Sequence, residues 1–108
     1  MEVKINSLKW TIKEVDTRSQ ELNANGNQCY GTCKYHTQEI FLDNSLKNDK
    51  KCQTLKHELA HAFISCYMLE QKQNYSEEDL CEFVALYSDK IVEIATKYME
   101  VTHNDKTN

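Results

Sequence analysis

The chain has 108 residues, of which 40% are hydrophobic and 28% are charged, and its formal net charge is −4. This composition is typical of one folded domain with a modest core, and it excludes a disordered chain. The acidic balance gives no basic footprint for nucleic acid, and no apolar run approaches the length that crosses a membrane. The amino-terminal residues lack the basic and apolar regions of a signal peptide, so we expect a cytoplasmic protein.

The first strand pattern lies near the amino terminus. Apolar and polar residues alternate from residue 3 to residue 16, and β-branched and aromatic side chains are enriched in residues 10–15. This pattern predicts a strand over residues 10–15. Residues 16–28 are polar and rich in turn formers, so we expect a loop there, with a short helix as the alternative for residues 17–22.

Two further strands are predicted in the next part of the chain. Residues 30–35 and 39–42 flank His36-Thr37-Gln38 and have the pattern of a β-hairpin. Cys29, Cys33 and His36 offer three ligands to a metal ion, separate from the site described below. No further Cys or His pair completes a set of four ligands. We therefore favour two reduced thiols in a hairpin, because a chain without a signal peptide keeps its cysteines reduced by default.

A long helix is predicted over residues 49–69. Its apolar side chains recur at helical spacing, which predicts that they face a core. They are Leu55, Leu59, Ala62, Phe63 and Cys66.

The same helix carries the sequence His57-Glu58-Leu59-Ala60-His61, which has the spacing H-E-x-x-H. Residues i and i+4 lie one turn apart on the same face, so both imidazoles can reach one metal ion. Glu58 lies beside them, where a carboxylate can take a proton from a metal-bound water. The alternative interpretation is a polar helix face with two solvated histidines and a surface carboxylate.

A second long helix is predicted from Ser76, as its N-cap, to about residue 101. Its predicted apolar face consists of Leu80, Phe83, Val84, Tyr87, Ile91, Ile94, Ala95 and Tyr98. Cys81, like Cys66, is expected to be a small core residue. Residues 102–108 are expected to form a frayed tail. Residues 1–108 then form one α+β domain, with a small sheet of about three strands packed on two long helices.

A catalytic zinc ion needs a third protein ligand. If the two helices are antiparallel neighbours, heights can be counted from their linker at about 1.5 Å per residue, which places Glu82 nearly level with His61. We therefore expect Glu82 to be the third ligand, with Glu78 as the alternative. Asp89 shares a face with Glu82 and is a candidate partner for a histidine N–H. The alternative interpretation of Glu82 is a solvated acid on an acidic helix.

These motifs together resemble a known family. The H-E-x-x-H spacing, followed by Glu82-Phe83-Val84-Ala85, is similar to the gluzincin arrangement, in which a Glu begins an E-x-x-A pattern on a downstream helix. From residue 30 to about residue 101 the chain resembles the small ImmA/IrrE-like metallopeptidases of phages and mobile elements. The resemblance implies a minimal zincin-like fold with one Zn²⁺ per chain, held by His57, His61 and Glu82, and with Glu58 as the catalytic acid and base.

The activity that this resemblance implies is that of a zinc metalloendopeptidase. Its substrate would be a protein or peptide, such as a phage or mobile-element repressor, and its partners would include neither nucleic acid nor a membrane. By analogy with the family, we expect the substrate to add as a strand to residues 39–42. Tyr35, His36 and Tyr87 are all candidates to stabilise the oxyanion.

Two other interpretations of a zinc site stay open. The chain could bind zinc without proteolysis and act by binding a host or phage regulator. A purely structural zinc site would need a fourth protein ligand such as Cys81 or Asp89, and it is less favoured because structural sites are usually rich in cysteine.

Overall fold

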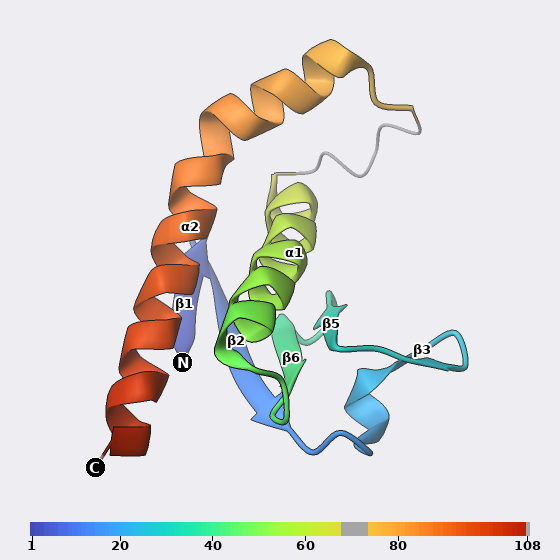
Figure 1. Ribbon diagram of the computed structural model, residues 1–108. Coiled ribbons are helices and arrows are strands. Elements are labelled where there is room, and N and C mark those ends of the chain that lie inside the picture. Colours follow the sequence, from blue (N-terminus) through green and yellow to red (C-terminus); the bar gives the residue numbers. More distant parts are fainter. Residues whose placement is uncertain (68–73, 108) are drawn as a thin grey trace.

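The computed structural model describes residues 1–67 and 74–107, with side chains up to Thr102. A four-stranded sheet and two helices make up most of the chain, so the predicted α+β class is confirmed (Figure 1). In chain order the elements are β1 (Glu2–Ile5), β2 (Leu8–Val15), the 3-10 helix η1 (Gln20–Leu22), β3 (Asn23–Ala24), β4 (Asn27–Gln28), β5 (Gly31–Lys34), β6 (Glu39–Asp43), α1 (Asn48–Cys66) and α2 (Glu77–Thr107).

The sheet has four strands, so the prediction of about three was wrong. The strand order is β1-β2-β6-β5, with β1 antiparallel to β2. The strand missing from the prediction is β1, which joins β2 through a two-residue turn at Asn6 and Ser7. Both residues have positive φ, 50° and 69°, as a tight hairpin turn requires. The turn contains no glycine, so the usual sequence signal for such a hairpin is missing.

The predicted hairpin of residues 30–42 is confirmed by the antiparallel pairing of β5 with β6. However, β6 also pairs with β2, in the parallel direction, and therefore lies inside the sheet. The expectation that residues 39–42 form the edge that receives a substrate strand was wrong for this reason. The edge strands of the four-stranded sheet are β1 and β5.

Helix α1 packs against the sheet through its predicted apolar face. All five residues of this face, from Leu55 to Cys66, are buried. Across from them, Trp10 of β2 is buried, and its Nε1 donates a hydrogen bond to the Cys66 sulfur at 3.1 Å. The helix spans Asn48–Cys66, and the predicted end at residue 69 lies outside the described residues.

Helix α2 begins where the sequence predicts. The Ser76 hydroxyl accepts a hydrogen bond from the Asp79 N–H, and the Asp79 carboxylate accepts one from the Ser76 N–H, both at 3.1 Å. This reciprocal capping satisfies two backbone donors at the helix start. The helix continues to Thr107 and so includes residues 102–107, for which a frayed tail was expected. None of the helices in the described ranges is long and apolar enough to cross a membrane.

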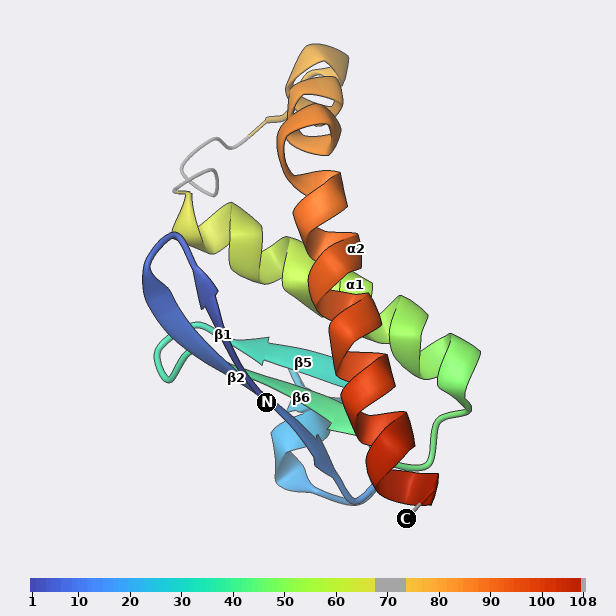
Figure 2. The same ribbon diagram turned by 90° about the vertical axis from the view of Figure 1, so that its left-hand side faces the viewer.

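The later part of α2 packs most deeply into the core, whereas Phe83 and Tyr87 are half-buried against it. Ile91, Ala95 and Tyr98 are buried, as predicted, in the part that lies beside α1 and the sheet (Figure 2). Leu80 and Val84 are each 57% exposed, and Cys81 is also exposed, so the prediction that they face the core was wrong. The first turns of α2 extend past the end of α1, where the described elements do not cover them (Figure 1).

A buried polar network joins α1, α2 and β2. The Lys51 ammonium of α1 donates to the Glu14 carboxylate of β2 at 2.8 Å, and the Tyr98 hydroxyl of α2 donates to the other oxygen of Glu14 at 2.6 Å. Burial, followed by the hydrogen bond to Glu14, raises the pKa of Tyr98. The network therefore ties both helices to β2.

Candidate metal and catalytic site

Two histidines lie together on the surface of α1. The rings of His57 and His61 pack edge to face, with centroids 5.0 Å apart and an interplanar angle of 73°. Both residues are exposed, whereas the flanking Leu59 and Ala62 are buried. The helix therefore presents two adjacent imidazoles outward, one turn apart, as two ligands of one metal ion require.

Glu58 is placed differently, because its side chain turns toward the sheet and is only 7% exposed. Burial raises the pKa of this carboxyl, and the neighbouring His57 partly offsets the shift. Partial burial, followed by the charge of His57, lowers the pKa of His61. A lowered pKa favours the neutral imidazole, which is the form that binds a metal ion.

A hollow of about 400 Å³ opens where α1 meets the start of β5. His57 and Glu58 line it together with Lys50 and Gln53 of the helix and Tyr30 before the strand. The Lys50 ammonium lies 5.1 Å from the centre of the Tyr30 ring. The candidate base and one candidate ligand thus share a cavity at the edge of the sheet.

Gly31 brings the strand this close to the helix. A Cβ atom at this position would lie 2.8 Å from Thr54 Cγ2 and 3.2 Å from Glu58 Cγ. Only glycine therefore fits between β5 and this turn of α1. Sequence reasoning did not identify Gly31 as a site residue. Its position at the start of a predicted strand, where glycine is otherwise unfavourable, was the available signal.

A second hollow, of about 290 Å³, lies on the His61 side and is lined by Tyr35, His61, Ile64 and Ser65. Tyr35, one of the predicted oxyanion donors, is therefore beside a candidate ligand. His36 is exposed in the turn between β5 and β6.

The third predicted donor, Tyr87, lies elsewhere. It packs between the helices, with its ring stacked on Tyr67 at 4.6 Å and 5.8 Å from the Phe63 ring. Since Tyr67 follows the last residue of α1, the two helices begin to pair near Tyr87.

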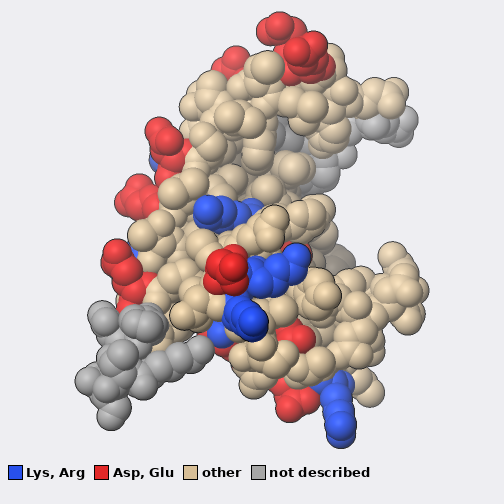
Figure 3. Space-filling model, viewed as in Figure 1, with Lys and Arg blue, Asp and Glu red and all other residues tan. Residues whose placement is uncertain are grey.

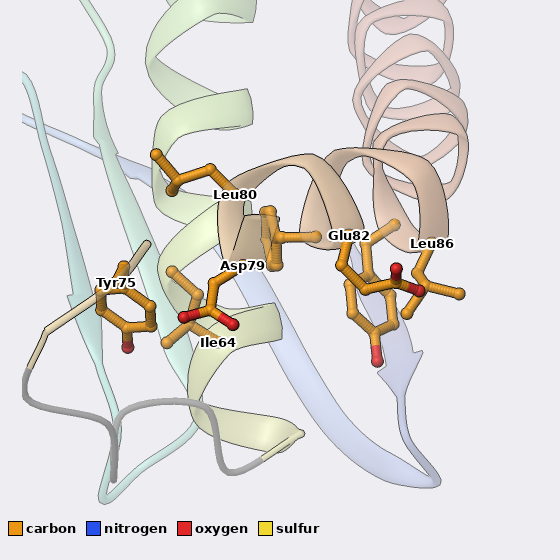
Figure 4. A pocket seen from close by; sticks show the side chains of 8 residues that line it. Ile64, Tyr75, Asp79, Leu80, Glu82 and Leu86 are labelled. Atoms are coloured by element: carbon orange, nitrogen blue, oxygen red, sulfur yellow. The ribbon is translucent and has the colours of Figure 1, made fainter. Parts of the chain in front are cut away.

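The predicted third ligand is not grouped with the histidines. Glu82 lies five residues before Tyr87 and lines a third hollow, whose wall includes Ile64 (Figure 4). Ile64 also lines the hollow of His61, so the two hollows adjoin. Over residues 1–67 and 74–102, whose side chains are described, no three His, Cys, Asp or Glu side chains come together to hold a metal ion. The prediction placed Glu82 level with His61 by assuming that the end of α1 and the start of α2 lie at the same height. In the structure, α2 instead extends past the end of α1.

Glu78 and Asp89 are both exposed on α2. Asp89 lies two residues before the buried Ile91, which places it about 200° around the helix from the packed face. The roles predicted for Glu82, Glu78 and Asp89 remain predictions.

The cysteines of the hairpin are free thiols. Burial, followed by the charges of Glu58 and Cys66, raises the pKa of Cys33 to about 12. The raised pKa favours the protonated thiol in the metal-free chain. Whether Cys29, Cys33 and His36 form a second metal site or Cys29 and Cys33 are only reduced thiols stays a prediction.

Comparisons of the chain with protein-family models, with curated proteins and with solved structures gave no match.

Proposed function

We propose that this chain is a zinc-dependent metalloendopeptidase of the gluzincin type, with a minimal zincin-like fold similar to that of the ImmA/IrrE-like enzymes. Its substrate would be a cytoplasmic protein, such as a phage or mobile-element regulator. The observation that carries the proposal is the exposed pair His57 and His61 beside the buried carboxyl of Glu58. Two such ligands and one such base are part of a hydrolytic zinc site, which also needs a third protein ligand.

The residues present fit part of a zinc site. His57 and His61 would supply two ligands to one Zn²⁺ per chain, and zinc, when bound, would lower the pKa of a water molecule and polarise the scissile carbonyl. Glu82 is the proposed third ligand and Glu78 the alternative. Either one requires the first turns of α2 to lie closer to His61 than they do in the structure.

Glu58 is the proposed proton carrier. Its carboxylate accepts a proton from the attacking water and delivers this proton to the leaving amine. Burial favours this role, because it raises the pKa of Glu58 from that of an ordinary carboxyl toward the range of an effective general base. Tyr35 is the best supported oxyanion donor of the three candidates, because it lines the hollow of His61.

The substrate is proposed to bind along β5 instead of β6. Strand β5 is at the edge of the sheet and starts at Gly31, next to Glu58. An extended peptide can add to such an edge through backbone hydrogen bonds. This arrangement would place a peptide bond beside the hollow that His57 and Glu58 line.

The test combines metal content with peptide cleavage. We expect about one zinc per wild-type chain, lost in His61→Ala and in Glu82→Ala. Glu58→Gln should keep zinc and lose cleavage by at least about a hundredfold, as removal of a general base does. The cleavage assay uses a library of extended peptides and mass spectrometry of the products.

The outcomes separate the competing interpretations. Zinc retained in Glu82→Ala would move the third ligand to Glu78 or another residue. Zinc without cleavage, and with no effect of Glu58→Gln on any function, would favour a zinc-bound binding module. No zinc in wild-type protein purified with excess metal would leave the two histidines as surface residues and overturn the proposal.

A further inference from the structure

In the first turns of α2 the apolar residues Leu80, Val84 and Leu86 are each more than half exposed. We define the α2 arm as residues 77–86. In the arm, Leu80 is 57% exposed and Leu86 is 54% exposed, whereas Ile91, Ala95 and Tyr98 on the same helix are buried. Clustered exposure of this kind marks an interaction surface more often than chance scatter does.

The exposed side chains border a hollow of about 210 Å³ between the arm and the end of α1. In Figure 4, Tyr75, Ile64 and Asp79 lie on one side of this hollow and Glu82 and Leu86 on the other. Its apolar lining consists of Ile64, Tyr75, Leu80, Phe83, Leu86 and Tyr87. The volume is below the roughly 300 Å³ of sites for drug-sized molecules, so the hollow suits one large apolar side chain.

The border of this hollow is acidic. Asp79 and Glu82 line it, and Glu77 and Glu78 lie on the same arm. Between residues 75 and 89 the sequence has no Lys or Arg. Figure 3 shows acidic side chains gathered at the amino-terminal end of the arm. A segment that places an apolar side chain in the hollow therefore gains from flanking positive charge.

The same charges disfavour a second copy of this chain as the occupant. A symmetric dimer would place the same surface of both chains face to face, and so would bring the two acidic arms together. Like charges across an interface are destabilising.

We propose that the α2 arm is a docking surface for a basic segment of another protein, in which one large apolar side chain is flanked by Lys or Arg. The apolar side chain enters the hollow between Ile64, Leu80 and Leu86. The flanking cations lie against Asp79 and Glu82. Since Glu82 is also the proposed third zinc ligand, the form that docks this segment is the metal-free chain. Because Ile64 also borders the hollow of His61, the docked segment lies next to the histidine pair. This surface does not depend on the proposed hydrolysis, so each can fail without the other.

The test measures binding of short fluorescein-labelled peptides to the full chain by fluorescence anisotropy. The probe has one Phe flanked by Lys residues in a Ser and Gly background. Two matched peptides carry Ser in place of Phe, or Glu in place of Lys. We expect the probe to bind at least about tenfold more tightly than either matched peptide, and its binding to weaken as salt is added.

Matched protein variants locate the surface. Leu80→Ser and Leu86→Ser should each weaken probe binding by about tenfold. Val84→Ser should leave binding within about twofold, because Val84 is as exposed as Leu80 but does not line the hollow. Circular dichroism melts check that all three variants are folded.

Three results would overturn the proposal. Equal binding of the Lys-flanked and Glu-flanked peptides would show that positive charge does not contribute to binding. Equal effects of Leu80→Ser and Val84→Ser would place binding outside the hollow. Self-association of the chain that Leu80→Ser abolishes, measured by sedimentation, would assign the surface to a second copy.

Discussion

Gly31 sets the distance between the sheet edge and the candidate site. The atoms that a Cβ at this position would meet come from Thr54, Glu58 and the Phe41 carbonyl, that is, from two different elements. A methyl group must therefore displace the Thr54 side chain and press on Glu58 and the backbone of β6. The position of Glu58 depends on a residue that has no side chain.

Gly31→Ala should destabilise the fold by about 1–3 kcal/mol, the usual effect of overpacking. Urea unfolding measures this loss. Thr54→Ser removes the Cγ2 atom of the closest approach, so it should recover part of the loss in the double variant. Gly26→Ala is the control, because a Cβ there meets no atom within 4 Å and its φ of +81° adds only backbone strain of about 1 kcal/mol. Strictly additive effects of Gly31→Ala and Thr54→Ser would contradict the proposed contact.

Asp43, at the end of β6, is a buried carboxylate with several donors. Its Oδ1 accepts hydrogen bonds from the Thr17 hydroxyl at 2.7 Å, the Ser45 N–H at 2.9 Å and the Ser45 hydroxyl at 2.7 Å. Burial raises the pKa of Asp43, but these hydrogen bonds and the charge of Lys51 together lower it below 3.8. The ionised form therefore holds the turn before α1 in place.

The lowered pKa predicts a pH dependence of stability. The folded state binds the Asp43 proton more weakly than the unfolded state, so the stabilisation is present above about pH 4 and is lost as pH falls through the folded pKa. Asp43→Asn should lose about 1–3 kcal/mol at pH 7 and should lose less than wild type on acidification. Urea unfolding at several pH values measures both effects. Asp16→Asn, an exposed carboxylate nearby, is the control, and parallel pH profiles for wild type and Asp43→Asn would contradict the prediction.

At the scale of elements, the packing of both helices onto β2 depends on the network of Lys51, Glu14 and Tyr98. The Lys51 side chain is 1% exposed and that of Glu14 17% exposed. A second ion pair on the same sheet, Lys13–Glu39, has a similar N–O distance of 2.7 Å, but its side chains are 50% and 22% exposed. The two pairs differ mainly in their access to water.

Lys51→Met should destabilise the protein by about 3–5 kcal/mol, because it removes the buried ammonium that pairs with the Glu14 carboxylate. Lys13→Met should cost less than about 1 kcal/mol, since water screens this exposed pair. The double variant Lys51→Met/Glu14→Gln should recover part of the loss. Denaturant unfolding of the four proteins tests this, and equal losses for Lys51→Met and Lys13→Met would contradict it.

At the scale of the whole molecule, the sequence predicted local features better than it predicted contacts between distant elements. The helical spacing from Leu55 to Cys66 predicted the buried face of α1, and the pattern of residues 30–42 predicted a hairpin. Both signals depend on neighbouring residues, so the sequence contains them.

The features that sequence reasoning missed depend on distant parts of the chain. Leu80 has the same helical spacing as Ile91, but Ile91 is buried in a core cluster with residues of α1 and the sheet, whereas Leu80 is exposed. The position of Glu82 relative to His61 depends likewise on where the two helices begin to pair. The β1 strand was missed because Asn6 and Ser7 form a turn that usually contains glycine.

The parallel pairing of β2 with β6 has a consequence for how the chain folds. The β1–β2 and β5–β6 hairpins each join neighbouring residues, and such hairpins form in about 1–10 μs. The pairing of β2 with β6 instead closes the long loop of residues 16–38. The conformational entropy of this loop is lost before the contacts between the two strands are gained. The two hairpins should therefore form early, and their joining along β2 and β6 should limit the folding rate. Until they join, α1 has only half a sheet against which to pack. The hollows beside His57 and His61 are lined by α1 and residues 29–35, so they do not require this last step.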